Sequence, residues 1–250
     1  MLRVEWGAAR PAGSDGVLRV ADGDMRWAWL VLPWAFCACA CLALWLSGGD
    51  LWWADRLYAL EGGRWVLREA RWAEDVVHRG GRVASLLLWL AVALAAAWPR
   101  RMGLPVAWRA PLARLALSVL VSVLLVAWLK RATHVDCPWD LARYGGGAEY
   151  LLPWAPLPPG HVVHACFPAG HAGSAYAWVA VYFFLSEVKP AWRVPGLALV
   201  LAGGALFGIV QQLRGAHFLS HDIASLAVCW QVACAFHCGR GVVSRRGGAA

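Results

Sequence analysis

The 250-residue sequence has little charge, since only 15% of its residues are Asp, Glu, Lys or Arg while 60% are hydrophobic. Soluble domains usually carry about 25% charged residues, so this composition excludes an ordinary soluble protein and indicates a polytopic membrane protein. Internal repeats and low-complexity tracts are also absent. We therefore expect one membrane domain at residues 27–240, between an N-terminal tail at 1–26 and a C-terminal tail at 241–250.

Two further absences narrow the function. Residues 1–26 are polar and mixed in charge, which does not fit a cleavable signal peptide, so the first apolar segment is expected to be its own insertion signal. HExxH and similar carboxylate-bearing metal motifs are missing. We expect no cofactor, no catalytic metal and no nucleic-acid partner; the sequence does not indicate an oligomeric state.

Six apolar stretches are present, each about long enough to cross a hydrocarbon core of ~30 Å. They predict an all-α bundle of six transmembrane helices. Their ranges are Trp27–Ser47, Val83–Trp98, Leu112–Leu129, His171–Val188, Val194–Leu213 and Ile223–Cys238.

The cations predict the orientation of this bundle. With six spans, both termini and the loops around 100–114 and 189–193 share one side, which carries 13 Lys and Arg against 5 Asp and Glu; the other side carries 10 of each. The positive-inside rule makes the first side cytoplasmic. In a bacterium the protein would then lie in the inner membrane, with its other face in the periplasm.

The outer connections differ in character. Residues 48–82 mix aromatic, aliphatic and charged side chains in a way that favours amphipathic helices in the headgroup layer. Residues 130–168 hold several prolines and a run of three glycines, which favours a folded loop without a long helix. Residues 214–222 form a short connection.

Three short motifs occur at the outer ends of these segments. Lys130 ends the third span, Pro168-Ala169-Gly170-His171 begins the fourth, and Gly215-Ala216-His217 ends the fifth, with His221 and Asp222 just beyond. In order and membrane side they resemble the three motifs of the type 2 phosphatidic acid phosphatase superfamily. The resemblance covers roughly residues 83–240.

That resemblance implies a phosphatase acting on a lipid phosphate or pyrophosphate without a metal, with the bilayer as its surroundings. Lys130 would bind the phosphate, the amides of Ala169 and Gly170 would hold it with His171, and His171 would protonate the leaving oxygen. His217 would attack phosphorus and form a phosphohistidine. The residue types fit these tasks, because a helix N-terminus attracts anions and a histidine can act as nucleophile or acid near neutral pH.

The sequence departs from the family pattern at four positions. Cys137 stands where the first motif usually has arginine, and Ala169 where the second has serine. In the third motif Gln211 replaces an arginine, for which Arg214 is the natural substitute; His221 replaces a carboxylate. Either His221 or Asp222 would orient His217. Arg143 is the first candidate to replace the lost first-motif cation, and Arg131 is the second.

Two cysteines share the outer loop, and the other six fall within apolar spans or near the inner side. In an oxidising compartment Cys137 and Cys166 can form a disulfide that ties the first motif to the second. Such a bond would explain a cysteine at an otherwise cationic position.

Other functions stay open at this level. A lipid-to-lipid phosphotransferase would use the same residues. His217 and His221, with His161 and His164, offer four imidazoles for a zinc hydrolase or a metal transporter. A non-catalytic bundle is the third alternative. Which lipid phosphate is the substrate does not follow from the loop composition.

Overall fold

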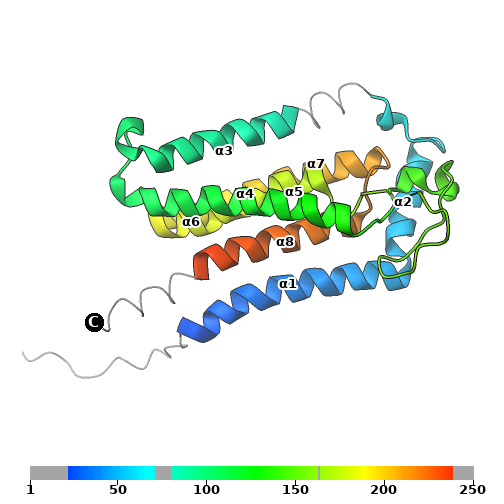
Figure 1. Ribbon diagram of the computed structural model, residues 1–250, viewed down its shortest axis with the longest axis horizontal. Helices are drawn as coiled ribbons and strands as arrows, with labels where there is room; N and C mark the ends of the chain where they lie inside the picture. The colour runs from blue at the N-terminus through cyan, green and yellow to red at the C-terminus, as the bar shows by residue number, and fades with distance from the viewer. Residues whose placement is uncertain (1–21, 71–79, 163, 239–250) are drawn as a thin grey trace, which may run out of the picture.

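The computed structural model describes residues 22–70, 80–162 and 164–238, and this part of the chain folds into helices without a β-strand. The α-helices appear in Figure 1. They are α1 (Asp22–Ser47), α2 (Gly49–Leu60), α3 (Gly81–Ala97), α4 (Arg109–Ala132), α5 (Gly170–Tyr176), α6 (Ala180–Val188), α7 (Arg193–Leu213) and α8 (Leu219–Cys238). Single 3₁₀ turns and one isolated bridge, Leu141 with Ala148, complete the described elements. The two tails fall almost wholly outside the described residues.

All the α-helices except α2 run along one common direction, and α2 crosses the end of the bundle at which α4 and α7 end (Figure 1). α1 begins and α8 ends at the opposite end of the bundle, where the α3–α4 and α6–α7 connections also lie. We call this the inner end, and the end crossed by α2 the outer end. The three motif segments all lie at the outer end.

The predicted count of six spans is not confirmed. By length and composition three helical segments can cross a membrane, namely Val106–Ala132, Pro190–Leu213 and Leu219–His237; a fourth is possible if Val31–Ser47 and Gly49–Leu60, bent by 72°, form one broken span. α3 is apolar but only 17 residues long. The segment predicted as the fourth span is divided into α5 and α6 by a 3₁₀ turn at Ala177–Val179. The chain is nonetheless a multi-pass membrane protein.

α8 lies at the centre of the packing, since it contacts α1, α4, α5 and α6. The main buried cluster joins Val119 and Val126 of α4 with Tyr176, Phe183 and Cys229. Close packing of α7 depends on two glycines. A Cβ at Gly204 would lie 2.1 Å from the Tyr176 ring, and one at Gly208 would lie 2.3 Å from Asp222 Oδ2. The small residues of the fifth predicted span therefore let the helices approach closely.

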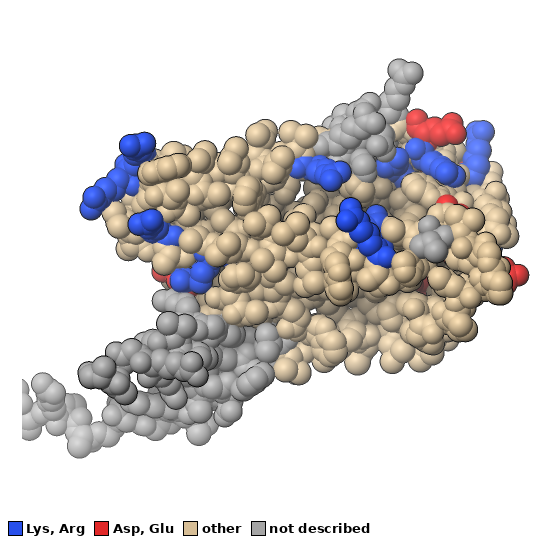
Figure 2. Space-filling model, viewed as in Figure 1, with Lys and Arg blue, Asp and Glu red and all other residues tan. Residues whose placement is uncertain are grey.

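Charged side chains lie toward the two ends of the helices on the face shown in Figure 2, and the band between them is uncharged. Exposed apolar side chains also lie along α3, α4 and α7, among them Leu87, Leu124 and Leu206, which are about 60% exposed. Such a surface suits the hydrocarbon layer and does not suit water.

The outer end carries a folded cap. After α4 ends at Ala132, the described residues up to 168 form only the 3₁₀ turns Pro138–Asp140 and Ala142–Tyr144 as helical elements, as the prolines and glycines of this segment predict. α2 differs from the expected surface helix, because Asp50, Ala54 and Leu57 are buried. It packs with Trp65, Tyr144 and Phe218 in a second buried cluster. Residues 71–79, where a further amphipathic helix was expected, lie outside the described residues.

Candidate active site

The fold brings the second and third motifs together at the outer end. His171 lies in the first turn of α5, and His217 lies in the connection between α7 and α8. Their ring centroids are 6.2 Å apart. Two imidazoles at this separation can approach one phosphorus atom from different sides, which a nucleophile and a general acid must do.

Lys130 of the first motif reaches the same place from the end of α4. Its Nζ would lie 3.8 Å from a Cβ added to Gly170, so the ammonium group sits against the start of α5. Glycine at this position leaves the space between the ammonium group and the helix N-terminus open. The site therefore combines a cation with the N-terminus of a helix, which favours negative charge.

Lys130, Gly170 and His171 line a cavity of about 480 Å³ between α3, α4 and α5. The rest of its wall is largely apolar, and Leu86 and Val123 are exposed on it. One charged side chain that the sequence did not single out, Arg82 of α3, also lines the cavity. Its position in the same cavity wall as Lys130 becomes visible only when α3 packs beside α4.

His217 is buried, with 3% of its surface exposed. Burial lowers the pKa of His217 well below its usual range, and the charge of Lys130 and the neighbouring His221 and His171 lower it further. The ring is therefore neutral at pH 7, the form in which an imidazole is nucleophilic. Its Nδ1 atom has no hydrogen-bond partner among the described residues.

The second motif is fixed to α8 by its backbone. The Ala169 amide donates to the His221 carbonyl at 3.1 Å, and Ser225 Oγ donates to the Ala169 carbonyl at 2.8 Å. The expectation that the Ala169 amide holds phosphate is corrected by this contact, because the amide already has a partner in the fold. The amides of Gly170 and His171 remain at the helix start.

His221 and Asp222 take different directions from the first turn of α8. The His221 ring lies 5.7 Å from the His217 ring and is also packed against Phe167 and Phe218. Asp222 faces α7 instead, where its Oδ2 accepts a hydrogen bond from Gln212 Nε2. This placement corrects the expectation for Asp222, since successive helical residues point about 100° apart. His221 is the neighbour of His217.

Arg214 is buried and comes directly after α7. Its guanidinium donates to Gln211 Oε1 and to the Arg68 carbonyl, both at 3.3 Å. The side chain is thus turned into the protein, away from bulk water and lipid. Gln211, which stands at the family's arginine position, is a partner that holds Arg214 in this direction.

Arg143 does not replace the missing first-motif cation. Its Nε and Nη2 donate to the two carboxylate oxygens of Asp55 at 2.7 and 2.6 Å, and the side chain is 55% exposed. Arg131 is exposed as well. The sequence could not predict this pair, because Asp55 belongs to α2, 88 residues before Arg143 in the chain, and meets it only in the fold.

The two loop cysteines are joined. Cys137 and Cys166 form a disulfide with a Cα–Cα distance of 5.3 Å, and the Cys166 amide donates to the Val135 carbonyl beside it. Cys137 therefore ties the segment after α4 to the segment before α5. The sequence identified this pair correctly, and its position links the first and second motifs.

The four-imidazole metal site is not assembled. His161 and His164 lie against Asp136, whereas His217 and His221 lie in the active-site region. Among the described residues, no group able to hold a metal ion includes His217 or His221.

Three residues that support the site were missed. Asp50 of α2 is 1% exposed and accepts hydrogen bonds from the amide and hydroxyl of Ser220, in the first turn of α8. Trp53 Nε1 donates to Gln212 Oε1 at 2.6 Å, which places Gln212 between Trp53 and Asp222. The only signal for Asp50 in the sequence is an acidic residue among apolar neighbours.

Known proteins match the chain in two ways. The model of the PAP2 superfamily matches residues 111–243, just over half of the chain. A crystal structure from Bacillus subtilis, described as the first transmembrane PAP2 type phosphatidylglycerolphosphate phosphatase, has a similar fold, with a TM-score of 0.53 at 16% identity; the match covers 89% of this chain and 100% of that one. No curated protein sequence matches. With its motif segments at one end of the bundle and the family model spanning all three of them, the chain belongs to the PAP2 superfamily.

Proposed function

We propose that this protein is a phosphatase that removes a phosphate group from a membrane lipid at the outer end of the bundle, through a phosphohistidine at His217. The observation that carries the proposal is the meeting of His217, His171 and Lys130 beside a largely apolar cavity. Membership of the PAP2 superfamily supports the phosphatase class.

The first chemical step is displacement at phosphorus. A ring nitrogen of neutral His217 forms a bond to phosphorus while the bond from phosphorus to the lipid oxygen breaks. His171 gives its proton to that oxygen, so the lipid alcohol leaves uncharged. Lys130 and the amides at the start of α5 offset the charge on the phosphoryl oxygens in the transition state.

The second step returns the enzyme to its starting state. His171, now neutral, takes a proton from water, and the resulting hydroxide oxygen bonds to phosphorus. The bond between phosphorus and His217 breaks, and inorganic phosphate leaves. Two histidines therefore carry the reaction, and neither step requires a metal ion.

The cavity supports a lipid as the substrate. Its volume of about 480 Å³ and its apolar wall of α3 and α4 side chains suit an acyl or prenyl chain, while Lys130 and Arg82 stand at its charged part. A soluble sugar phosphate would leave this wall in contact with water. The similar Bacillus subtilis structure is named for phosphatidylglycerolphosphate, which makes that lipid the first to test.

The charge distribution supports an orientation with the outer end in the periplasm. The inner end gathers the cationic connections between α3 and α4 and between α6 and α7, and cations favour the cytoplasmic side. The disulfide at the outer end suits an oxidising compartment.

The decisive experiment measures phosphate release from a panel of lipid phosphates by the protein in detergent, in water enriched in ¹⁸O and with EDTA present. We expect release that survives EDTA, with ¹⁸O in the phosphate and a phosphorylated His217 peptide after rapid quenching. Transfer of the phosphoryl group to a second lipid without release of phosphate would identify a phosphotransferase. Released phosphate that lacks solvent oxygen would show that the carbon–oxygen bond breaks, which would contradict attack at phosphorus. Failure to release phosphate from every lipid would contradict the proposal.

The matched control for this experiment is His237→Gln. His237 lies in the last turn of α8, at the inner end, beside Glu187. It has the same side chain as His217, but it lies at the other end of the bundle. Its replacement should leave phosphate release within about twofold of the wild type.

A further inference from the structure

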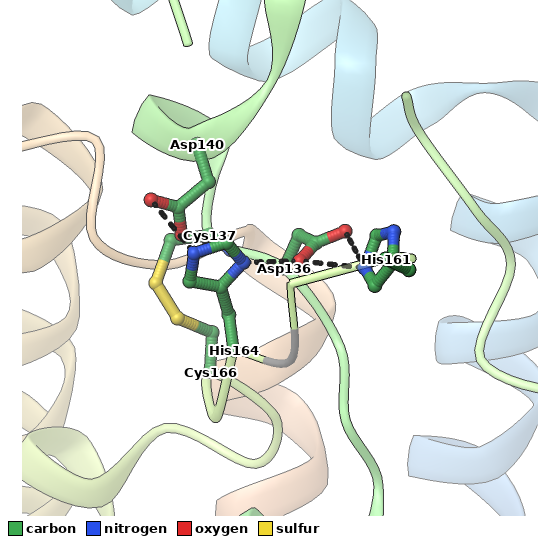
Figure 3. Close-up of polar contacts among 6 residues, drawn as sticks. All are labelled: Asp136, Cys137, Asp140, His161, His164 and Cys166. Atoms are coloured by element: carbon green, nitrogen blue, oxygen red, sulfur yellow. Dashed lines mark hydrogen bonds and ion pairs between the residues drawn. A yellow bond between two sulfur atoms is a disulfide. The ribbon is translucent and has the colours of Figure 1, made fainter. Parts of the chain in front are cut away.

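A second group of polar side chains lies in the outer loop, apart from the histidines of the active site. Asp136 is buried between the rings of His161 and His164 (Figure 3). His164 Nδ1 lies 2.6 Å from Asp136 Oδ1, and His161 Nε2 lies 3.1 Å from Asp136 Oδ2. The three ligand atoms, one from each residue, lie within 4.8 Å of one another.

We propose that Asp136, His161 and His164 bind a divalent transition-metal ion such as Zn²⁺, which acts as a structural clamp in the outer loop. Two imidazoles and one carboxylate form a ligand set that Zn²⁺ takes in proteins. Tetrahedral ligands at about 2.0 Å from the ion are roughly 3.3 Å apart. Asp136 Oδ1 lies 3.3 Å from His161 Nε2, which already fits, and 2.6 Å from His164 Nδ1. The second distance needs an expansion of about 0.7 Å.

The other nitrogen of His164 supplies independent support. His164 Nε2 faces Asp140 Oδ1 at 3.7 Å, and Asp140 is itself held by the Cys137 amide through its Oδ2. When Nδ1 binds a metal, Nε2 carries the ring proton, and a carboxylate behind that proton fixes the ring and strengthens the ligand. Figure 3 shows this order of groups, with His164 between Asp136 and Asp140.

The surroundings also provide access and a fourth ligand. His161 and His164 line an open cavity of about 710 Å³ on the surface of the loop. An ion can enter from this side, and a water molecule can complete its coordination. Asp136, with 6% of its surface exposed, closes the site from the protein side.

The consequence for the fold follows from the neighbouring disulfide. Asp136 precedes Cys137, and His164 comes two residues before Cys166, so the ion would join the same two segments that the disulfide joins. The first segment follows the end of α4, which carries Lys130, and the second leads to Gly170 and His171 at the start of α5. The clamp would therefore stabilise the loop that fixes the distance between the first and second motifs, without touching the substrate.

The experiment uses the full chain in detergent under non-reducing conditions, stripped with EDTA and then gel-filtered. Titration with Zn²⁺, followed by elemental analysis, should give about one ion per chain. The ion should raise the unfolding temperature by on the order of 5 °C. X-ray absorption of the bound ion in the wild type should show imidazole and oxygen ligands and no sulfur, a readout that needs no variant.

The variants locate the ion. His161→Ala, His164→Ala and Asp136→Asn should each weaken binding at least tenfold. His134→Asn is the control, because His134 is an exposed loop histidine at φ +53°, which asparagine also tolerates, and it should bind Zn²⁺ as the wild type does. His217→Ala should also keep the ion.

Three results would overturn the proposal. They are an absence of stoichiometric Zn²⁺ in the wild type, a sulfur ligand in the absorption spectrum, and loss of the ion in His217→Ala but not in His164→Ala. The clamp does not depend on the proposed phosphatase activity, since binding is measured on the protein without substrate.

Discussion

The two ends of the bundle differ in what they bury. At the outer end, Asp50, Asp136, Gln211, Gln212, Arg214, His217, Ser220, His221 and Asp222 are all buried. Among the described residues at the inner end the polar contacts are more exposed. There Arg114 pairs with Glu187 at 2.6 Å, and His237 lies beside the same carboxylate. Both ends meet the membrane surface, so the membrane alone does not explain the difference.

Burying polar groups costs free energy unless they are paired, and the outer end meets this cost with a network spread over distant segments. Asp50 holds Ser220, Trp53 holds Gln212, and Gln212 holds Asp222. A stable protein would not need such a network for packing, which the apolar core already provides. The difference agrees with the proposed function, in which the outer end carries the chemistry.

The sharpest way to break this comparison is His217→Ala. Loss of a covalent nucleophile should lower turnover by roughly 10⁴-fold or more, while His237→Gln at the inner end stays near the wild type. Phosphate release from a lipid phosphate in detergent measures both variants, and size-exclusion profiles show that both remain folded. Comparable activity in the two histidine variants would remove the functional distinction between the ends.

The next effect is expected at Lys130. Lys130→Ala should lower kcat/KM by about 10²- to 10³-fold, because a fixed charge beside the transferring phosphoryl group is lost. Arg82→Ala should raise KM by about tenfold or less, since Arg82 is exposed at the cavity wall. Steady-state kinetics of both variants give the ranking. A larger loss for Arg82 would make it the main phosphate ligand.

Breaking the disulfide should lower the free energy of unfolding by an amount similar to the loss of transition-state stabilisation in Lys130→Ala. In the chain-entropy account, a bond between residues 29 apart contributes ~3–4 kcal/mol. The double variant Cys137→Ser with Cys166→Ser should therefore unfold at lower temperature, as measured by thermal denaturation in detergent. Cys39→Ser is the control, because Cys39 is a free, exposed cysteine. An unchanged midpoint in the double variant would show that the loop is held by its other contacts.

The sequence predicted those features that depend on local pattern. The apolar stretches placed α4, α7 and α8 within a few residues, and motif order brought His171 and His217 to one site. Cys137 and Cys166 were paired because they share a loop. Each of these follows from composition, from position along a helix, or from the side of the membrane.

The features that the sequence did not predict depend on contacts between distant segments. Arg143 was a candidate for the phosphate site, but α2 supplies Asp55 to it. Asp222 was one of two candidates to orient His217, but it lies against Gln212 and Gly208 of α7. The Ala169 amide likewise went to a carbonyl of α8. Hydrophobicity also could not count the spans, because the 3₁₀ turn at Ala177–Val179 and the bend after α1 interrupt two of them.

A pH dependence sharpens the comparison in stability. Burial first, and then the charge of Lys130, lower the pKa of His217 below its usual range. As the pH falls, His217 in the unfolded chain therefore becomes protonated at a higher pH than His217 in the folded chain. Stability contributed by neutral His217 is present above about pH 6.5 and is lost as the pH falls below it. The unfolding temperature of His217→Gln should therefore depend less steeply on pH between about 6.5 and 5 than that of the wild type. Equal slopes would contradict a depressed pKa.

The smallest effect is expected at the exposed pair of Arg143 and Asp55. Its two hydrogen bonds are short, but the side chains are 55% and 39% exposed, and exposed ion pairs contribute about 1 kcal/mol or less. Arg143→Ala should leave phosphate release unchanged and shift the free energy of unfolding by about 0.5 kcal/mol, with the shift shrinking in high salt.

Asp50→Asn is the matched comparison, because Asp50 lies in α2 like Asp55 but is only 1% exposed. Asparagine keeps the shape but offers one carboxamide oxygen where two carboxylate oxygens now accept from Ser220. A buried hydrogen bond to a charged group is worth about 1.5–3 kcal/mol, so Asp50→Asn should destabilise several times more than Arg143→Ala. It should also loosen the start of α8, where His221 and the contacts of Ala169 begin, and so lower activity. If Arg143→Ala instead abolished phosphate release, the loop would have to bring that guanidinium to the substrate, and the division between an exposed pair and a buried site would fail.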